Sequence, residues 1–205
     1  MQDLLLVRHG FAGSNRDDLA SSTVPGEGLT PEGVEQARTL ALTLADEAID
    51  VAMTSRLART QETLGLALDG RNVPVVIEAE LDEIHFGSFD GGPLEEYRAW
   101  AASHPPDEPA PGGGESRAQA AARFARGLRL VLARPEANVL VVGHALAIRY
   151  LIDAAQAHVP AARMSPIEHA FPYRLDRGDA ERAAEVLEAW SAAVAPRFRD
   201  PATHG

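Results

Sequence analysis

Two unbroken apolar runs, each leading into a histidine and a glycine, constrain the fold of this chain more than any other feature of its sequence. The first is LLLVRHG at 4–10, and the second is VLVVGH at 139–144. Apolar runs of this length that end at glycine are typical of strands buried on both faces of a parallel sheet. Because ligands bind at the carboxyl edge of such sheets, we expect His9 and His144 to meet there.

Strand and helix patterns alternate four times along the chain, which predicts one α/β domain over 1–205. We expect a three-layer sandwich with a mostly parallel sheet and helices on both faces. Further strands are predicted at 49–53 and 73–77, and helices at 31–47, 56–68, 93–102, 116–133, from 145 to about 157, and at 180–194. The region 165–175 is expected to be another strand or a hairpin, and 196–205 a frayed tail.

The stretch 80–115 breaks this alternation. It mixes acids, aromatics and glycines without a clear period, and the part from His104 to Gly114 holds four prolines and three glycines. Apart from the short helix at 93–102, this composition cannot form regular structure. We interpret 80–115 as a small cap insertion that lies over the sheet edge.

The charge pattern excludes several partners and mechanisms. A net charge of −11 repels nucleic acid and anionic lipid, so we expect neither as a partner. All 19 basic residues are arginine, which excludes lysine chemistry and leaves arginine, histidine or backbone amides to hold any anion.

The chain has no cysteine, which excludes disulfides and thiolate metal sites. We see no signal peptide, expect a cytoplasmic protein, and leave a homodimer open.

Two arginines stand where a helix dipole disfavours them. Arg56 and Arg59 fall in the first turn of the helix expected at 56–68, where negative charge is favoured. This placement indicates that one of them is needed for an anion. The arginines at 117, 123, 126 and 129, in contrast, are interpreted as the solvated face of the helix at 116–133.

Taken in order, the motifs over about 1–155 resemble those of the histidine phosphatase superfamily, which includes the cofactor-dependent phosphoglycerate mutases. The motifs are Arg8-His9-Gly10 followed by Asn15, Leu29-Thr30-x-x-Gly33 with Gln36-Ala37, Ser55-x-Leu57-x-Arg59-x-x-x-Thr63, Glu83-x-x-Phe86-Gly87-x-x-x-Gly91, Gly113-Gly114-Glu115-Ser116 and Val142-Gly143-His144. The resemblance implies the α/β fold and a phosphatase acting on a phosphomonoester, with no cofactor and no metal.

The resemblance also assigns roles to individual residues. It implies a phosphohistidine intermediate on His9, with Arg8, Arg59 and His144 around the phosphoryl oxygens. Glu83 would protonate the leaving oxygen and then take a proton from the attacking water. Positive charge held in place in this way is the largest catalytic contribution in many such sites.

Three further residues are expected to contact the substrate: Asn15, Ser21 and Ala145. Ala145 departs from the family, in which glycine commonly follows the second histidine. Phe11 and Ala12 also depart, since the family commonly has an acid or amide and then a hydroxyl residue there. Ile84 stands where the mutases that this chain resembles carry arginine. These departures favour a phosphatase over an efficient mutase.

Other functions stay open at this point. A metalloenzyme could use His9, Glu83, His85 and His144, although Arg8 and Arg59 would repel its cation. A non-catalytic protein that binds a phosphorylated ligand could share the fold. Within the enzyme interpretation, the substrate could be a small phosphorylated metabolite, a phosphoprotein or phosphoglycerate. The cap insertion favours an enclosed small metabolite.

Overall fold

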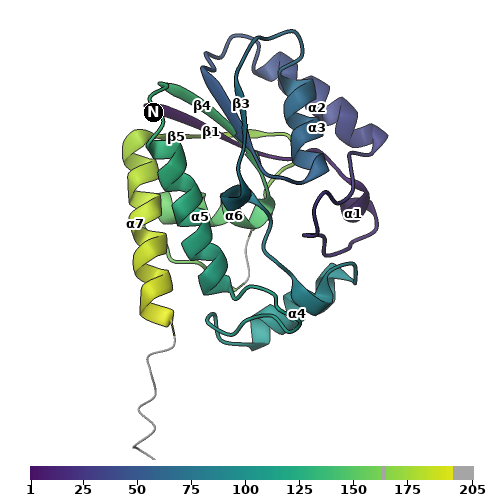
Figure 1. Cartoon of the computed structure of the whole chain (residues 1–205), viewed down its shortest axis with the longest axis vertical. Helices are drawn as coiled ribbons and strands as arrows, with labels where there is room; N and C mark the ends of the chain where they lie inside the picture. The colour runs from purple at the N-terminus through teal and green to yellow at the C-terminus, as the bar shows by residue number, and fades with distance from the viewer. Residues whose placement is uncertain (163–164, 196–205) are drawn as a thin grey trace, which may run out of the picture.

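A five-stranded sheet with the strand order β3-β2-β4-β1-β5 forms the centre of the computed structural model, which describes residues 1–162 and 165–195 (Figure 1). Its strands are β1 (Asp3–Arg8), β2 (Val51–Thr54), β3 (Val75–Ile77), β4 (Asn138–Gly143) and β5 (Pro172–Asp176). The first four are parallel, and β5 pairs antiparallel to β1 at the edge. The frayed tail expected at 196–205 lies outside the described residues.

Helices cover both faces of the sheet, because successive strand residues point to opposite sides. Leu4 and Leu6 of β1 enter a core shared with α5, α6 and α7, whereas Leu5 and Val7 enter a second core with α2 and α3. The helices are α1 (Gly13–Arg16), α2 (Pro31–Thr43), α3 (Ala58–Ala67), α4 (Leu94–Ser103), α5 (Arg117–Leu132), α6 (Ala145–Ala155) and α7 (Arg177–Val194). The predicted α/β sandwich with a mostly parallel sheet is confirmed.

Several predicted boundaries are wrong. The helix expected at 31–47 ends at Thr43, and the helix expected at 56–68 begins only at Ala58. Arg56 therefore lies before the helix and not in its first turn. The cause is Ser55, whose hydroxyl binds His144 and Thr60 instead of capping the helix.

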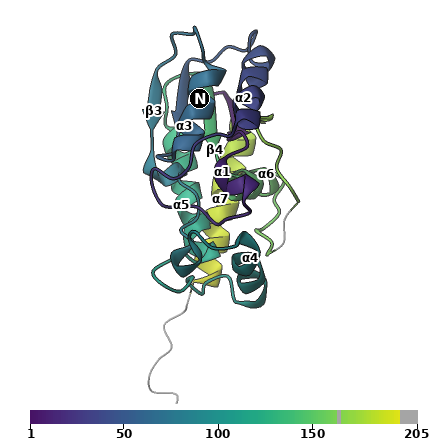
Figure 2. The same ribbon diagram turned by 90° about the vertical axis from the view of Figure 1, so that its right-hand side faces the viewer.

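The stretch 80–115 lies at one end of the molecule and is joined to the loop after β1. Short 3₁₀ turns at Ala79–Leu81 and Gly87–Phe89 lead into α4, which Figures 1 and 2 show at the end of the molecule away from α2. The Asp90 carboxylate accepts hydrogen bonds from the Ser22 amide at 2.6 Å and the Ser22 hydroxyl at 2.9 Å. Ala20 adds backbone bonds to Gly91 and Gly92. No helix of the described residues is long and apolar enough to cross a membrane.

Close backbone contact explains the glycine at the start of α2. A Cβ atom on Gly33 would lie 2.1 Å from the Phe11 carbonyl oxygen, and one on Gly10 would lie 2.7 Å from the Gly33 carbonyl oxygen. The loop that follows His9 can therefore rest directly on the N-terminus of α2. This contact fixes the backbone on the carboxyl side of His9.

Replacing Gly33 with alanine is expected to lower the free energy of unfolding by about 1–3 kcal/mol, because the new methyl group overlaps backbone atoms that cannot rotate away. Urea denaturation measures the change. Gly65→Ala is the matched control, since nothing lies within 4 Å of a Cβ there. In the middle of α3 that substitution should raise the stability by about 0.5–1 kcal/mol. Equal effects of the two substitutions would contradict the role of the contact.

Candidate active site

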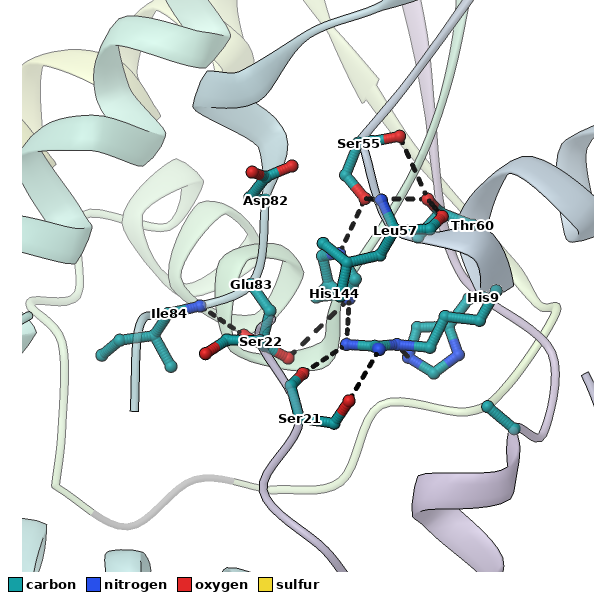
Figure 3. Close-up of polar contacts among 12 residues, drawn as sticks. His9, Ser21, Ser22, Ser55, Leu57, Thr60, Asp82, Glu83, Ile84 and His144 are labelled. Atoms are coloured by element: carbon teal, nitrogen blue, oxygen red, sulfur yellow. Dashed lines mark hydrogen bonds and ion pairs between the residues drawn. The ribbon is translucent and has the colours of Figure 1, made fainter. Parts of the chain in front are cut away.

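The two strand-end histidines meet as the sequence predicts. Strands β1 and β4 are adjacent and in register, so the His9 amide donates to the Gly143 carbonyl at 3.0 Å. The ring centroids of His9 and His144 lie 5.3 Å apart, and both side chains are buried. Figure 3 shows His9, His144, Glu83 and Ser21 turned towards a common centre.

Neighbouring groups determine which nitrogen of His9 carries its proton. Nδ1 lies 2.8 Å from the Gly10 carbonyl oxygen, which can only accept, so Nδ1 is the protonated nitrogen. Nε2 therefore carries the lone pair, and the Arg59 Nε–H donates to it at 3.2 Å. Burial, together with the charges of Arg59 and Arg8, holds the pKa of His9 well below its ordinary value. The imidazole is thus neutral and nucleophilic at Nε2.

A chain of hydroxyl groups orients His144 from behind. Its Nε2 lies 2.9 Å from the Ser55 hydroxyl, which lies 2.8 Å from the Thr60 hydroxyl, and Thr60 donates to the Leu57 carbonyl at 2.8 Å. Because that carbonyl only accepts, the chain runs in one direction, with His144 Nε2 as its first donor. Burial, with Arg59 as the next largest cause, lowers the pKa of His144 well below its ordinary value.

Arg59 lies between the two imidazoles. Its Nη2 lies 3.4 Å from His144 Nδ1 and donates to the Ser21 carbonyl at 2.8 Å, while Nη1 lies 3.4 Å from the Ser21 hydroxyl. Only 2% of Arg59 is exposed, and burial lowers its pKa. Ser21, expected from the sequence to contact substrate, is thus also the residue that holds Arg59 in place.

Arg8 is a second guanidinium at the same edge of the sheet. Its Nη1 donates to the Ile167 carbonyl at 2.7 Å, whereas its buried Nε makes no hydrogen bond within residues 1–162 and 165–195. Burial lowers the pKa of Arg8 to about 10, against the opposing charge of Glu83. A buried cation with an unused donor is suited to an anionic ligand.

Glu83 faces the histidines from the opposite wall. Its Oε2 lies 3.9 Å from His144 Nδ1, and its Oε1 accepts from the Ile84 amide at 2.9 Å. Burial raises the pKa of Glu83, and Arg59 is the largest opposing cause. The carboxyl group therefore keeps its proton to higher pH than an ordinary glutamate, as a general acid must.

Arg123 holds the segment that carries Glu83, so its expected place on a solvated helix face is wrong. It is 8% exposed and donates to the carbonyls of Asp82 and Glu83 at 2.8 and 3.0 Å. Its guanidinium also forms an ion pair with Glu115 at 2.6 Å. Because the Glu115 carboxylate accepts from the His85 amide at 3.0 Å, this pair fixes both sides of the Glu83 segment.

A cavity of about 160 Å³ opens onto these groups. Asn15, Ser21 and Ala145, the expected substrate contacts, all line it, and so do four of the five expected catalytic residues, namely Arg8, His9, Arg59 and Glu83. The fifth, His144, is not a lining residue but lies directly beside two of them, because its Nδ1 is 3.4 Å from Arg59 Nη2 and 3.9 Å from Glu83 Oε2. The Asn15 Oδ1 accepts from the Ala12 amide at 3.0 Å, which leaves the amide nitrogen as the donor of this side chain. Arg98 and Arg117 also line the cavity.

Of the four residues of the metalloenzyme alternative, His9, Glu83 and His144 come together and His85 does not. His85 is exposed and is not among the residues that line the cavity. In the described part of the chain, no group of three or more histidine, cysteine, aspartate or glutamate residues is placed to hold a metal ion. Arg56 is not in the cavity either, because its side chain forms an ion pair with the buried Asp82 at 2.6 Å.

Sequence reasoning missed His169. Its Nδ1 lies 2.8 Å from the His9 carbonyl oxygen, and its ring centroid lies 5.5 Å from that of His9. Burial lowers the pKa of His169 to about 4, so the ring is a neutral support for the backbone of His9. The residue comes from the segment before β5, and no local pattern in the sequence indicates that this segment returns to β1.

Comparison with known proteins agrees with this geometry. The chain matches the model of the histidine phosphatase superfamily (branch 1) over residues 4–192. It is 33% identical over 184 residues to an adenosylcobalamin/α-ribazole phosphatase of Escherichia coli strain K12, covering 85% of this chain and 86% of that protein. It is 34% identical over 165 residues to a 2,3-bisphosphoglycerate-dependent phosphoglycerate mutase of Rhizobium rhizogenes, covering 73% and 77%.

A solved structure shows the same relationship. The α-ribazole phosphatase of Shigella flexneri superimposes with a TM-score of 0.74 at 30% sequence identity, covering 85% of this chain and 90% of that one. The resemblance inferred from the ordered motifs is thereby confirmed, and so is the interpretation of the chain as a phosphatase-type enzyme. The chain belongs to the histidine phosphatase superfamily.

Proposed function

We propose that this histidine phosphatase hydrolyses a small phosphorylated metabolite, a phosphomonoester, through a phosphohistidine intermediate on His9. The observation that carries the proposal is the neutral His9, whose Nε2 lone pair faces Arg59 at 3.2 Å, opposite a carboxyl group of raised pKa. Nucleophile, cations and acid are thus within one cavity.

In the first step, His9 Nε2 attacks phosphorus and the bond to the ester oxygen breaks. Arg8, Arg59 and His144 hold the three other phosphoryl oxygens, on which charge is spread in the transition state. The incoming dianion also favours protonation of His144, so both of its nitrogens can then donate. The leaving oxygen takes its proton from Glu83.

In the second step, water attacks the phosphohistidine. Glu83, now a carboxylate, takes a proton from that water, and the P–N bond to His9 breaks to release inorganic phosphate. The guanidinium groups supply the positive charge that a metal ion supplies in other phosphatases, so we propose that the reaction is independent of metal.

The cavity favours a small substrate with an apolar part. Beyond the cations its wall is formed by apolar and aromatic side chains, namely Leu19, Ile84, Phe86, Leu94, Tyr97, Leu146 and Tyr150. The α-ribazole phosphatases of E. coli and S. flexneri, to which this chain is similar, carry a small metabolite in their names. Residues of α4, among them Leu94 and Tyr97, line the cavity, which supports the cap interpretation of 80–115 and a small substrate over a phosphoprotein. The expected cytoplasmic location and the homodimer stay predictions.

Phosphoglycerate mutase activity is a second candidate function. The departures at Phe11 and Ile84 indicate fewer charges for a carboxylate, but Arg98 and Arg117 line the cavity and add two cations. Mutases at 34% identity are also among the relatives. We favour hydrolysis because the residue after Glu83 is the buried, apolar Ile84, where the mutases that the chain resembles carry an arginine.

Rapid quenching of the enzyme with a ³²P-labelled phosphomonoester should trap an acid-labile, alkali-stable phosphoprotein, also in the presence of a chelator. His9→Ala should abolish the label and lower kcat by about 10³-fold or more, because the nucleophile is lost. His158→Ala, at an exposed position outside the cavity, is the matched control. Labelling that survives in His9→Ala would overturn the assignment.

Glu83→Gln should slow the hydrolysis of esters with poor leaving groups by about 10²–10⁴-fold and of activated aryl phosphates far less, since the latter need little protonation. Because the acid must be protonated, kcat/KM for poor leaving groups should fall as pH rises through the raised pKa of Glu83. Glu83→Gln should remove this alkaline fall. Glu96→Gln, on the exposed side of α4, is the control, and equal losses on both substrate types would count against Glu83.

Hydrolysis and isomerisation can be compared directly. With 3-phosphoglycerate and catalytic amounts of 2,3-bisphosphoglycerate, we expect release of inorganic phosphate to exceed formation of 2-phosphoglycerate. Both products are measured in the same reaction. If isomerisation is faster by orders of magnitude, the chain is a mutase, and Arg98 and Arg117 are the cations that bind the carboxylate.

A further inference from the structure

The wall of the cavity opposite the phosphate-binding groups contains a buried hydroxyl group. Tyr150 of α6 lines the cavity and is 1% exposed. Within residues 1–162 and 165–195, no acceptor lies within hydrogen-bond distance of its hydroxyl. A buried hydroxyl without an acceptor is destabilising, so such a group in a cavity indicates a ligand atom that completes it.

Arg117 lies beside this hydroxyl but cannot satisfy it fully. Burial raises the pKa of Tyr150 to about 12, and the nearby Arg117 is the main opposing cause. A guanidinium only donates hydrogen bonds, so it can donate to the tyrosine oxygen but cannot accept a hydrogen bond from the tyrosine O–H. The O–H of Tyr150 therefore still requires an acceptor.

Arg117 is itself placed against the electrostatic preference of its helix. It is the first residue of α5, where the helix dipole disfavours positive charge. One hydrogen bond to the His104 carbonyl at 3.1 Å holds it, and it forms no ion pair with the carboxylates of the described residues. Arg117 and Tyr150 both line the same cavity.

Aromatic and apolar side chains line the same cavity as this polar pair. The rings of Phe86 and Tyr97 meet edge to face, with centroids 4.7 Å apart. On α6, Leu146 and Tyr150 are four residues apart and share one face of the helix. A cavity of about 160 Å³ is similar in volume to one that accommodates benzene.

We propose that Tyr150 and Arg117 form a leaving-group subsite that selects phosphomonoesters whose leaving group carries an oxygen acceptor on an apolar or aromatic body. This inference rests on the proposed phosphatase function. Tyr150 donates to the acceptor oxygen, and Arg117 strengthens the contact when that oxygen is anionic. Both residues are specificity-determining, and neither touches the reacting phosphorus.

The test uses substrates with the same benzylic leaving oxygen. They are benzyl phosphate, its 3- and 4-hydroxymethyl derivatives and its 4-carboxy derivative. For each derivative, the selectivity is kcat/KM divided by kcat/KM for benzyl phosphate, so a general loss of activity cancels. Tyr150→Phe should lower the selectivity of at least one derivative about tenfold, the effect of one hydrogen bond. Arg117→Gln should act mainly on the carboxy derivative.

Tyr173→Phe is the matched control, because the Tyr173 hydroxyl accepts from the Glu168 amide outside the cavity. A selectivity that falls in Tyr150→Phe but not in this control supports the subsite. Unchanged selectivity for every derivative, or an equal loss on all four substrates, would overturn it while leaving the phosphatase function intact. If the unmodified enzyme hydrolyses none of the four although His9 is labelled by other esters, the proposed leaving-group class is wrong.

Discussion

The site depends on one buried guanidinium placed between two imidazoles. Arg59 reaches His9 Nε2 at 3.2 Å and His144 Nδ1 at 3.4 Å, and the Ser21 carbonyl fixes its orientation. Its charge contributes to the lowered pKa of both imidazoles. Because a guanidinium only donates hydrogen bonds, His9 Nε2 and His144 Nδ1 face it with their lone pairs. An incoming phosphate group can replace the imidazoles as the acceptor for Arg59. In the reaction that we propose, the same guanidinium keeps His9 neutral before substrate binds and holds a phosphoryl oxygen afterwards.

The fold and the meeting of His9 with His144 could be predicted because their signals are local. A buried strand that ends in Arg8-His9 is readable within a few residues, and parallel strands place their carboxyl ends together. The supports could not be predicted in this way. The pattern of α5 indicates a solvated face for Arg117 and Arg123, because it cannot show that carbonyl and carboxylate groups of the 80–115 segment bind them. His169 is similar, because its contact with His9 spans 160 residues of sequence.

The loop after β1 and the segment around Glu83 act as one structural unit. Asp90 binds Ser22, and Ser22 in turn accepts the Phe86 amide at 3.2 Å. The same loop positions Arg59 through Ser21. One hydrogen-bonded network thus joins the loop after β1, Arg59 and the segment of Glu83, although they come from three distant parts of the chain. A displacement of α4 would therefore change the geometry of the phosphate-binding groups as well as the size of the cavity.

The position of β1 in the sheet determines when the site can form during synthesis. Its two neighbours are β4 and β5, and both begin after residue 137. Until these segments leave the ribosome, β1 has no partner on either edge, and Leu4 and Leu6 lack the part of their core that α6 and α7 supply. His9 can therefore reach its buried, neutral state only after most of the chain has been made. Pairing between the first strand and strands this distant in sequence favours slow folding. The arrangement of His9 beside His144 therefore forms late in folding.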